Sequence, residues 1–132
     1  CNGMKKKGIL NAQLAGYIAG LAHKECFMIT DAGMPIPKGV PVVDLAVCGG
    51  VPTFRQVMDA IMGEVAVEHY TVAIGEHNPV IWSYIQEKLP GARHEMIDHV
   101  DLKEMSGQIK FAVRTGEFTP YPNVILQAAV VY

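Results

Sequence analysis

Short apolar runs alternate with helix-like segments along most of this chain, and this alternation limits the fold more than any other feature of the sequence. The segments between the runs carry helix signals over about ten residues each. Strands that alternate with helices of this length favour a single α/β domain in three layers, α/β/α, with a mixed and mostly parallel sheet. The apolar runs have the length of strands and lie at residues 26–30, 42–47, 66–74, 93–97, 110–114 and 123–131.

Residues that cap helix N-termini predict where the helices begin. Asn11 precedes apolar residues at helical spacing, and Asn78 precedes a proline that suits the first position of a helix. The stretch TFRQ, from Thr53 to Gln56, matches a capping box and is the strongest helix signal in the chain. A further short helix is predicted from Asp101.

Length and composition indicate one domain and exclude several classes of partner. The chain has 132 residues, of which 50% are apolar and 18% charged, and its net charge is −2. We expect residues 4–132 to form one domain, and the charge argues against nucleic acid as a partner. No apolar run approaches the roughly 20 residues of a membrane-spanning helix. Residues 1–3 precede a natural-looking start at Met4 and are interpreted as a possible cloning remnant.

The cysteines and histidines give no sign of a disulfide framework or a metal site. Cys1, Cys26 and Cys48 form no CxxC motif and cannot all pair, which favours a reducing compartment, and we predict the cytoplasm. The five histidines form no HExxH motif. The CGG stretch at 48–50 is not a phosphate-binding glycine loop, so no metal or nucleotide cofactor is predicted.

His23 and Asp31 flank the first predicted strand in LAHKECFMITDAGMPIPKG, residues 21–39. Ligands of open α/β sheets bind outside the carboxyl ends of strands, which makes Asp31 a candidate for a pocket mouth. His23 is a candidate acid–base group, although a strand between the two residues can hold them at opposite ends of the sheet. The alternative is structural: His23 ends a helix as a cation, and Asp31 hydrogen-bonds its own turn.

The polar loop RTGEFTPYPN, residues 114–123, is a second candidate for ligand binding. It lies between two apolar strands, and loops held by such a scaffold often bind ligands. The alternative is an ordinary turn built on Thr119, Pro120 and Pro122. Arg114 and Glu117 are candidates to support the loop, or they form a plain surface ion pair.

Several stretches together resemble one family of sugar enzymes. KKGILN, LAHKECFMITDAGMPIPKG, DLAVCGGVPTFRQV, EHNP and AVRTGEFTPYPNVILQAAVVY are similar to the D-ribose pyranase family, which is related to the L-fucose mutarotases. The resemblance covers Met4 to Tyr132. Its specific motifs are the H…DAGxPIP block and the terminal RTGExxPYxN block, and the continuation DAGMPIP favours the ribose branch.

The resemblance implies an isomerase that interconverts the β-pyranose and β-furanose forms of D-ribose by acid–base opening and closure of the ring, without a cofactor. His23 matches the family's proton donor. The residues that match its sugar-binding positions are Asp31, His99, Tyr121, Pro122 and Asn123. The resemblance also implies a ring-shaped homo-oligomer, often a decamer.

Two departures from the family pattern leave the preferred sugar open. Ala22 and Pro122 stand where relatives commonly have glycine and alanine, and Pro122 removes a backbone N–H that could have contacted a sugar oxygen. The alternatives are a mutarotase for another monosaccharide such as fucose, and a sugar-binding protein that performs no catalysis.

Overall fold

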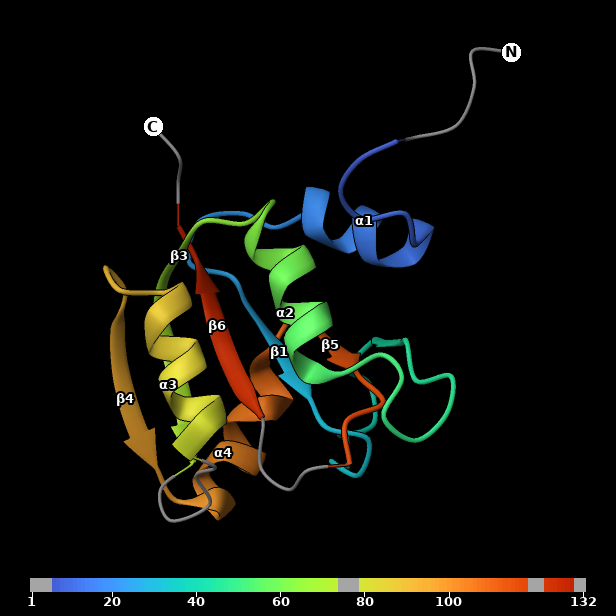
Figure 1. The fold of residues 1–132 in the computed structure, drawn as a ribbon. Coiled ribbons are helices and arrows are strands. Elements are labelled where there is room, and N and C mark those ends of the chain that lie inside the picture. Colours follow the sequence, from blue (N-terminus) through green and yellow to red (C-terminus); the bar gives the residue numbers. More distant parts are fainter. Residues whose placement is uncertain (1–5, 74–78, 119–122, 130–132) are drawn as a thin grey trace.

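The computed structural model describes residues 6–73, 79–118 and 123–129. Most of its helices and strands follow the apolar periodicity and caps of the sequence, and η1 is a short 3-10 helix (Figure 1). Asn78, predicted to cap a helix, lies outside the described residues. The elements are α1 (Ala12–Ala19), β1 (Cys26–Thr30), β2 (Val42–Asp44), α2 (Phe54–Met62), β3 (Val67–Ala73), α3 (Pro79–Lys88), β4 (Arg93–Ile97), α4 (His99–Met105), η1 (Ser106–Gln108), β5 (Phe111–Arg114) and β6 (Val124–Ala128).

The strands of the described residues form one six-stranded sheet in the order β2-β5-β1-β6-β3-β4. β6 runs antiparallel to its neighbours β1 and β3, whereas the other neighbouring strands pair in parallel. The prediction of a mixed, mostly parallel sheet is therefore confirmed. β1 lies in the interior of the sheet between β5 and β6, so strand pairing fixes the positions of both its ends.

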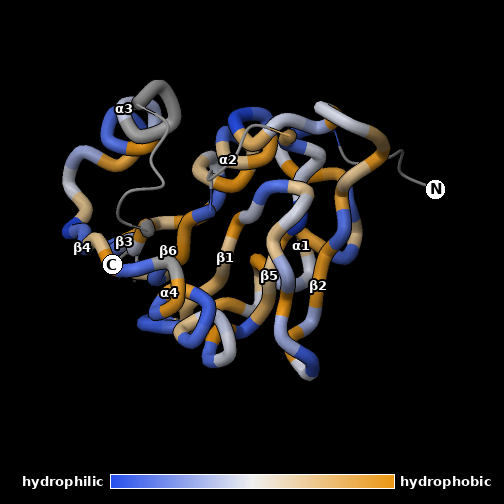
Figure 2. The backbone as a smooth tube through the Cα atoms, turned by 90° about the horizontal axis from the view of Figure 1, so that it is seen from below, coloured by the Kyte–Doolittle hydropathy of each residue, from blue (hydrophilic) through white to orange (hydrophobic). Residues whose placement is uncertain are grey.

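Helices cover both faces of the sheet and give the predicted three layers; Figure 2 shows α2 and α3 on one side and α4 on the other. Side chains alternate along β1, so Phe27 faces the core beneath α1, α2 and α3, and Met28 faces the opposite core. Leu102 of α4 and Ile125 of β6 pack with Met28 in that second core. Because apolar side chains point to both faces, β1 is covered on both sides.

The structure corrects several predicted boundaries, and the strand predicted over 123–131 spans only Val124–Ala128 among the described residues. The strand predicted over 42–47 is wrong beyond Asp44, because the Asp44 carboxylate accepts the backbone N–H of Ala46 at 3.1 Å and turns the chain. The helix predicted from Asp101 instead begins at His99, and the carbonyl of Asp98 accepts the N–H of Leu102. Asp101 lies in the first turn, where a negative charge suits the helix dipole.

The two edges of the sheet differ from its interior. β2 has three residues, follows Pro41, and ends at Asp44, whose carboxylate pairs with Arg114 at 2.9 Å. β4 exposes the side chains of Arg93 and Glu95. Both edges therefore carry charged side chains.

Candidate active site

A pocket of about 540 Å³ opens where β1 and β5 end and β6 begins. Ligands of α/β sheets bind at this end of the strands, as expected for Asp31. The pocket combines carboxylate, cationic, amide and aromatic side chains from segments far apart in sequence, which suits a small polar ligand. Its lining residues are Asp31, Ala32, Gly33, Met34, Pro35, Lys103, Arg114, Glu117, Phe118 and Asn123.

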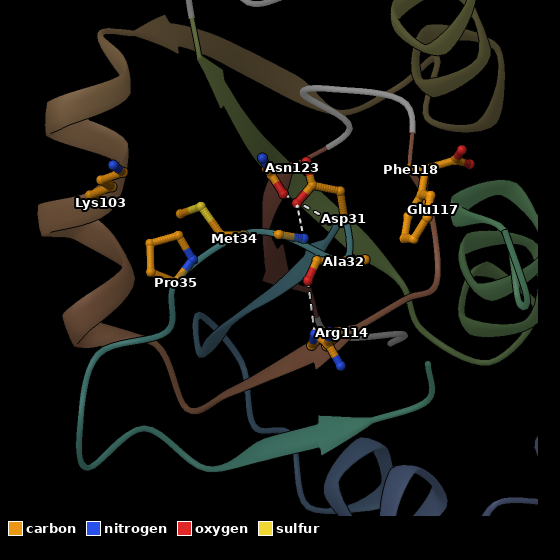
Figure 3. Close-up of a pocket in the computed structure, with 10 residues that line it drawn as sticks. Asp31, Ala32, Met34, Pro35, Lys103, Arg114, Glu117, Phe118 and Asn123 are labelled. Carbon is orange, nitrogen blue, oxygen red and sulfur yellow. Dashed lines mark hydrogen bonds between the residues drawn. The ribbon is translucent and has the colours of Figure 1, made fainter. Parts of the chain in front are cut away.

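Asp31 and Asn123 meet in this pocket although they are 92 residues apart (Figure 3). The backbone N–H of Asp31 donates to Oδ1 of Asn123 at 2.9 Å, and Asn123 is buried. Oδ1 of Asp31 accepts the N–H of Gly33 at 3.0 Å, so the structural alternative for Asp31, a hydrogen bond to its own turn, is confirmed. The same turn presents Asp31 to the pocket, and the structural and binding interpretations are compatible.

The RTGE block forms the frame of the pocket. Nε of Arg114 donates to the carbonyl of Ala32 at 3.0 Å, while Nη1 pairs with Asp44. The hydroxyl of Thr115 donates to the carbonyl of Thr30 at 2.7 Å in a buried position. Arg114 therefore does more than form a surface ion pair with Asp44, because it also holds the backbone directly after Asp31.

Glu117 ties the pocket wall to the start of α2. Its carbonyl accepts the N–H of Ala32 at 2.9 Å, and its side-chain Oε1 accepts the N–H of Phe54 at 3.1 Å. A carboxylate at a helix N-terminus is favoured by the free N–H groups and by the dipole. The predicted supporting role of Arg114 and Glu117 therefore extends from their own loop to the Asp31 turn and to α2.

His23 lies at the other end of the sheet. It follows α1 in a turn before β1, its side chain is 41% exposed, and its Nε2 lies 3.2 Å from Oε1 of Glu68. α1 already ends at Ala19, so the alternative in which His23 ends that helix is wrong. β1 separates His23 from Asp31, and five strand residues span roughly 17 Å. Within one chain the structure does not bring the two residues together.

The other predicted site residues are only partly described. His99 is the first residue of α4, and Tyr121 and Pro122 lie outside the described residues. Lys103 and Phe118 line the pocket but were not predicted. Phe118 is 74% exposed, and such an aromatic side chain in the quoted RTGEF stretch was a usable signal. Lys103 had no comparable signal, because only the packing of α4 brings it to the pocket.

Two further classes of feature are not found in the described part of the chain. Its histidine, cysteine and acidic side chains form no group of three or more that could hold a metal ion. None of its helices is both long enough and apolar enough to cross a bilayer.

A model of the RbsD / FucU transport protein family matches residues 4–131. The chain belongs to this family. Among its RbsD / FucU relatives, the D-ribose pyranase of Cutibacterium acnes is 45% identical over 130 residues, which cover 96% of this chain and 98% of that protein. The D-ribose pyranase of Streptomyces avermitilis is 44% identical over 131 residues, which cover 98% of this chain and all of that one (100%). The resemblance seen in the sequence is thereby confirmed.

Solved structures of RbsD / FucU proteins confirm the fold as well. The structure of Bacillus subtilis RbsD complexed with D-ribose superposes with a TM-score of 0.92 at 37% identity, covering 98% of this chain and 100% of that one. A fucose mutarotase from Streptococcus pneumoniae, in complex with L-fucose, has a TM-score of 0.78 at 20% identity, with 92% and 94% of the chains covered. At that identity the second likeness supports the fold alone.

Proposed function

We propose that this chain is a D-ribose pyranase, an isomerase that interconverts the β-pyranose and β-furanose forms of D-ribose. The observation that carries the proposal is the pocket built around Asp31 and Asn123, in a chain that matches a ribose-bound RbsD along 98% of its length. Carboxylate and amide groups at such a site suit a ligand that consists mainly of hydroxyl groups.

The reaction moves protons and needs no change of oxidation state. When the pyranose opens, the C1–O5 bond breaks, O5 gains a proton and the anomeric hydroxyl loses one, which gives the open-chain aldehyde. Closure through O4 reverses these transfers and gives the furanose. Imidazole suits both directions because its ordinary titration lies nearest neutrality among the side chains. We assign the role of acid–base catalyst to His23.

The sugar is held by the groups around the pocket. The Asp31 carboxylate accepts hydroxyl hydrogens, and Asn123 offers its amide NH₂, since its Oδ1 accepts from the backbone of Asp31. His99, Tyr121 and Pro122 complete the proposed binding set from their match to the family motif. Pro122 contributes no N–H, so its contact with sugar is limited to its ring and carbonyl.

We further propose that each working site is shared between neighbouring copies in a ring-shaped homo-oligomer, with a decamer as the expected size. His23 and the pocket lie at opposite ends of β1, and one monosaccharide is far shorter than that strand. A neighbouring copy that places its His23 at this pocket brings the acid–base group and the sugar-binding groups together around one sugar. We also propose that the protein acts in the cytoplasm.

NMR saturation transfer between ribose forms tests the proposed activity. The wild-type protein is expected to accelerate pyranose–furanose exchange. His23→Ala is expected to lower the catalysed exchange rate by about 10²–10⁴-fold, the usual contribution of a positioned acid–base group.

His94→Ala is the matched control, since His94 lies on the edge strand β4 and has no place in the proposed site. It should retain wild-type exchange. Unchanged exchange in His23→Ala would refute the role of His23. Ribose binding without any acceleration by the wild type would instead identify a sugar-binding protein.

A further inference from the structure

His23 stands on a turn that is braced on several sides. The N–H of Glu25 donates to the carbonyl of Ala22 at 3.1 Å, which closes a turn with His23 and Lys24 at its centre. Lys24 has a φ of 71°, a left-handed conformation that a non-glycine residue rarely adopts unless its surroundings impose it. The turn therefore has one defined shape.

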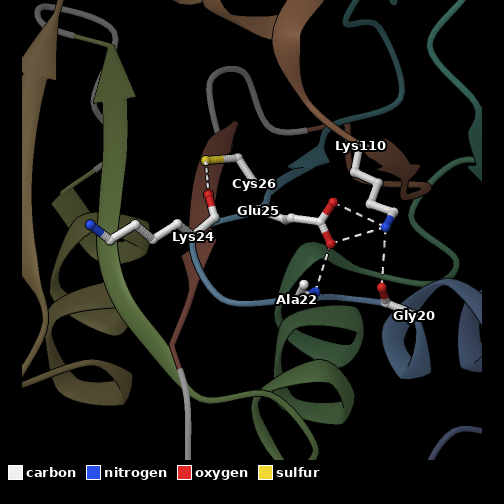
Figure 4. Close-up of polar contacts among 6 residues, drawn as sticks. All are labelled: Gly20, Ala22, Lys24, Glu25, Cys26 and Lys110. Carbon is white, nitrogen blue, oxygen red and sulfur yellow. Dashed lines mark hydrogen bonds and ion pairs between the residues drawn. The ribbon is translucent and has the colours of Figure 1, made fainter.

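Glu25 and Lys110 fix this turn to the body of the domain (Figure 4). Oε1 of Glu25 accepts the N–H of Ala22 at 2.6 Å, and Nζ of Lys110 reaches both Glu25 oxygens and the carbonyl of Gly20. The hydrogen bond from Lys110 lowers the pKa of the Glu25 carboxyl, so its charge persists to lower pH than that of an isolated glutamate. Such bracing limits where the imidazole of His23 can go.

The sheet also holds the turn. The N–H of Lys24 donates to the carbonyl of Ala128 at 2.9 Å, and the N–H of Ala128 donates to the carbonyl of Glu25 at 2.9 Å. The backbone on both sides of the Lys24–Glu25 bond is therefore paired with the end of β6. His23 therefore stands on a turn whose backbone is held by the sheet.

The side chain of Glu68 reaches His23 from a bulge in β3. Across β6 the pairing passes from Val67↔Ala128 to His69↔Gln127, so Glu68 is an extra residue with no partner position of its own. Bulges redirect side chains and are common beside active sites. Oε1 of Glu68 lies 3.2 Å from Nε2 of His23 and accepts from Nε2 of Gln127 at 3.3 Å.

We propose that Glu68 is a positioning residue for His23, and that Nδ1 of His23 is the nitrogen that exchanges protons with the sugar. An ionised carboxylate only accepts hydrogen bonds, so Nε2 must carry its hydrogen toward Glu68. In the neutral imidazole the lone pair then lies on Nδ1, on the opposite side of the ring. Gln127 holds the carboxylate in place. This inference rests on the proposed function of His23.

The tautomer of His23 can be determined by NMR in the absence of substrate. Long-range ¹H–¹⁵N spectra of histidine-labelled protein, with the His23 signals assigned by their loss in His23→Ala, should show the neutral ring protonated at Nε2. In Glu68→Ala the same ring is expected to become a mixture of tautomers. A wild-type ring protonated at Nδ1 would overturn the proposal.

Kinetic constants distinguish a role of Glu68 in positioning His23 from a role in the stability of the protein alone. Glu68→Ala is expected to lower kcat for ribose exchange by about tenfold or more, by analogy with carboxylates that orient metal-bound histidines. KM should stay unchanged, because Glu68 contacts His23 and Gln127 and is not among the groups proposed to hold the sugar. Glu68→Gln keeps an acceptor oxygen and should recover part of the lost kcat.

Glu95→Ala on the exposed strand β4 is the matched control and should leave both kinetic constants unchanged. An unchanged kcat in Glu68→Ala would overturn the positioning role. A wild type that fails to accelerate exchange would refute the proposed function itself. A wild type that accelerates exchange with the ring protonated at Nδ1 would refute only the role of Glu68.

Discussion

At the scale of single residues, Gly116 shows why the RTGE block contains a glycine. A Cβ built at Gly116 would lie 2.8 Å from the carbonyl oxygen of Cys48 and would overlap the carbonyl of Val51. The N–H of Gly116 donates to the carbonyl of Pro52 at 2.8 Å, and its own carbonyl accepts from Gly50 at 2.6 Å. Backbone packs against backbone at Gly116, so no flexible side chain can move aside to make room for a Cβ.

Gly116→Ala is therefore expected to destabilise the protein by about 1–3 kcal/mol, the usual cost of forcing atoms into a packed site. Urea unfolding of the two proteins would measure this difference in the free energy of unfolding. Gly107→Ala is the control, because a Cβ there meets nothing within 4 Å. Equal losses in both variants would contradict the steric explanation.

Individual site residues were predictable from the sequence to different degrees. Spacing alone left Asp31 between a turn residue and a ligand-binding residue, and the structure places it in both settings. Its partner Asn123 lies in the polar loop 114–123, whose position made it a candidate for ligand binding, and the family resemblance assigned Asn123 to the sugar-binding set. Glu68 was not foreseen, because two polar residues in a row, Glu68 and His69, do not by themselves distinguish a bulge from an exposed stretch of strand, and only pairing with β6 reveals the bulge.

At the scale of elements, local signals located most helices and strands. The capping box at Thr53 forms as predicted: the Thr53 hydroxyl accepts the N–H of Gln56 at 3.2 Å, and the Gln56 side chain accepts the N–H of Thr53 at 2.9 Å. The strand at 26–30 and the one at 93–97 also have their predicted bounds. The helix predicted from Asp101 was misplaced because Asp98 and Asp101 are equally good caps by residue type.

Thr53→Ala should remove one side of this capping box and lower the free energy of unfolding by about 1 kcal/mol. Thermal or urea unfolding would measure the loss. Helix α2 should still form, because Glu117 continues to accept the N–H of Phe54. Ser83→Ala, an exposed position within α3, serves as the control with little expected change. A stability change in Thr53→Ala no larger than in this control would argue against the cap.

At the scale of the whole molecule, the layers and the mostly parallel sheet were predictable, whereas the strand order was not. Alternating strands and helices imply a covered sheet, but the insertion of β6 between β1 and β3 depends on contacts between distant parts of the chain. The separation of His23 from Asp31 likewise became definite only when β1 was seen to lie between them.

That separation predicts complementation between two inactive variants. If His23 of one copy serves the pocket of a neighbour, His23→Ala and Asp31→Ala chains should regain activity when unfolded together and refolded as mixed oligomers. Random mixing of equal amounts should restore about a quarter of the sites, since each needs an intact residue from both neighbours. Ribose exchange measured by NMR gives the result, and the separately refolded variants are the controls. Mixed samples without recovered exchange would refute the shared site.

The charged edges of the sheet have a consequence for solubility during folding and storage. A strand edge with free N–H and C=O groups recruits other chains unless it is short or charged. β2 offers only three residues after a proline, and β4 carries Arg93 and Glu95. A chain in which half the residues are apolar thus gains protection against growth into fibrillar stacks, and copies that associate are directed toward contacts other than strand-to-strand extension.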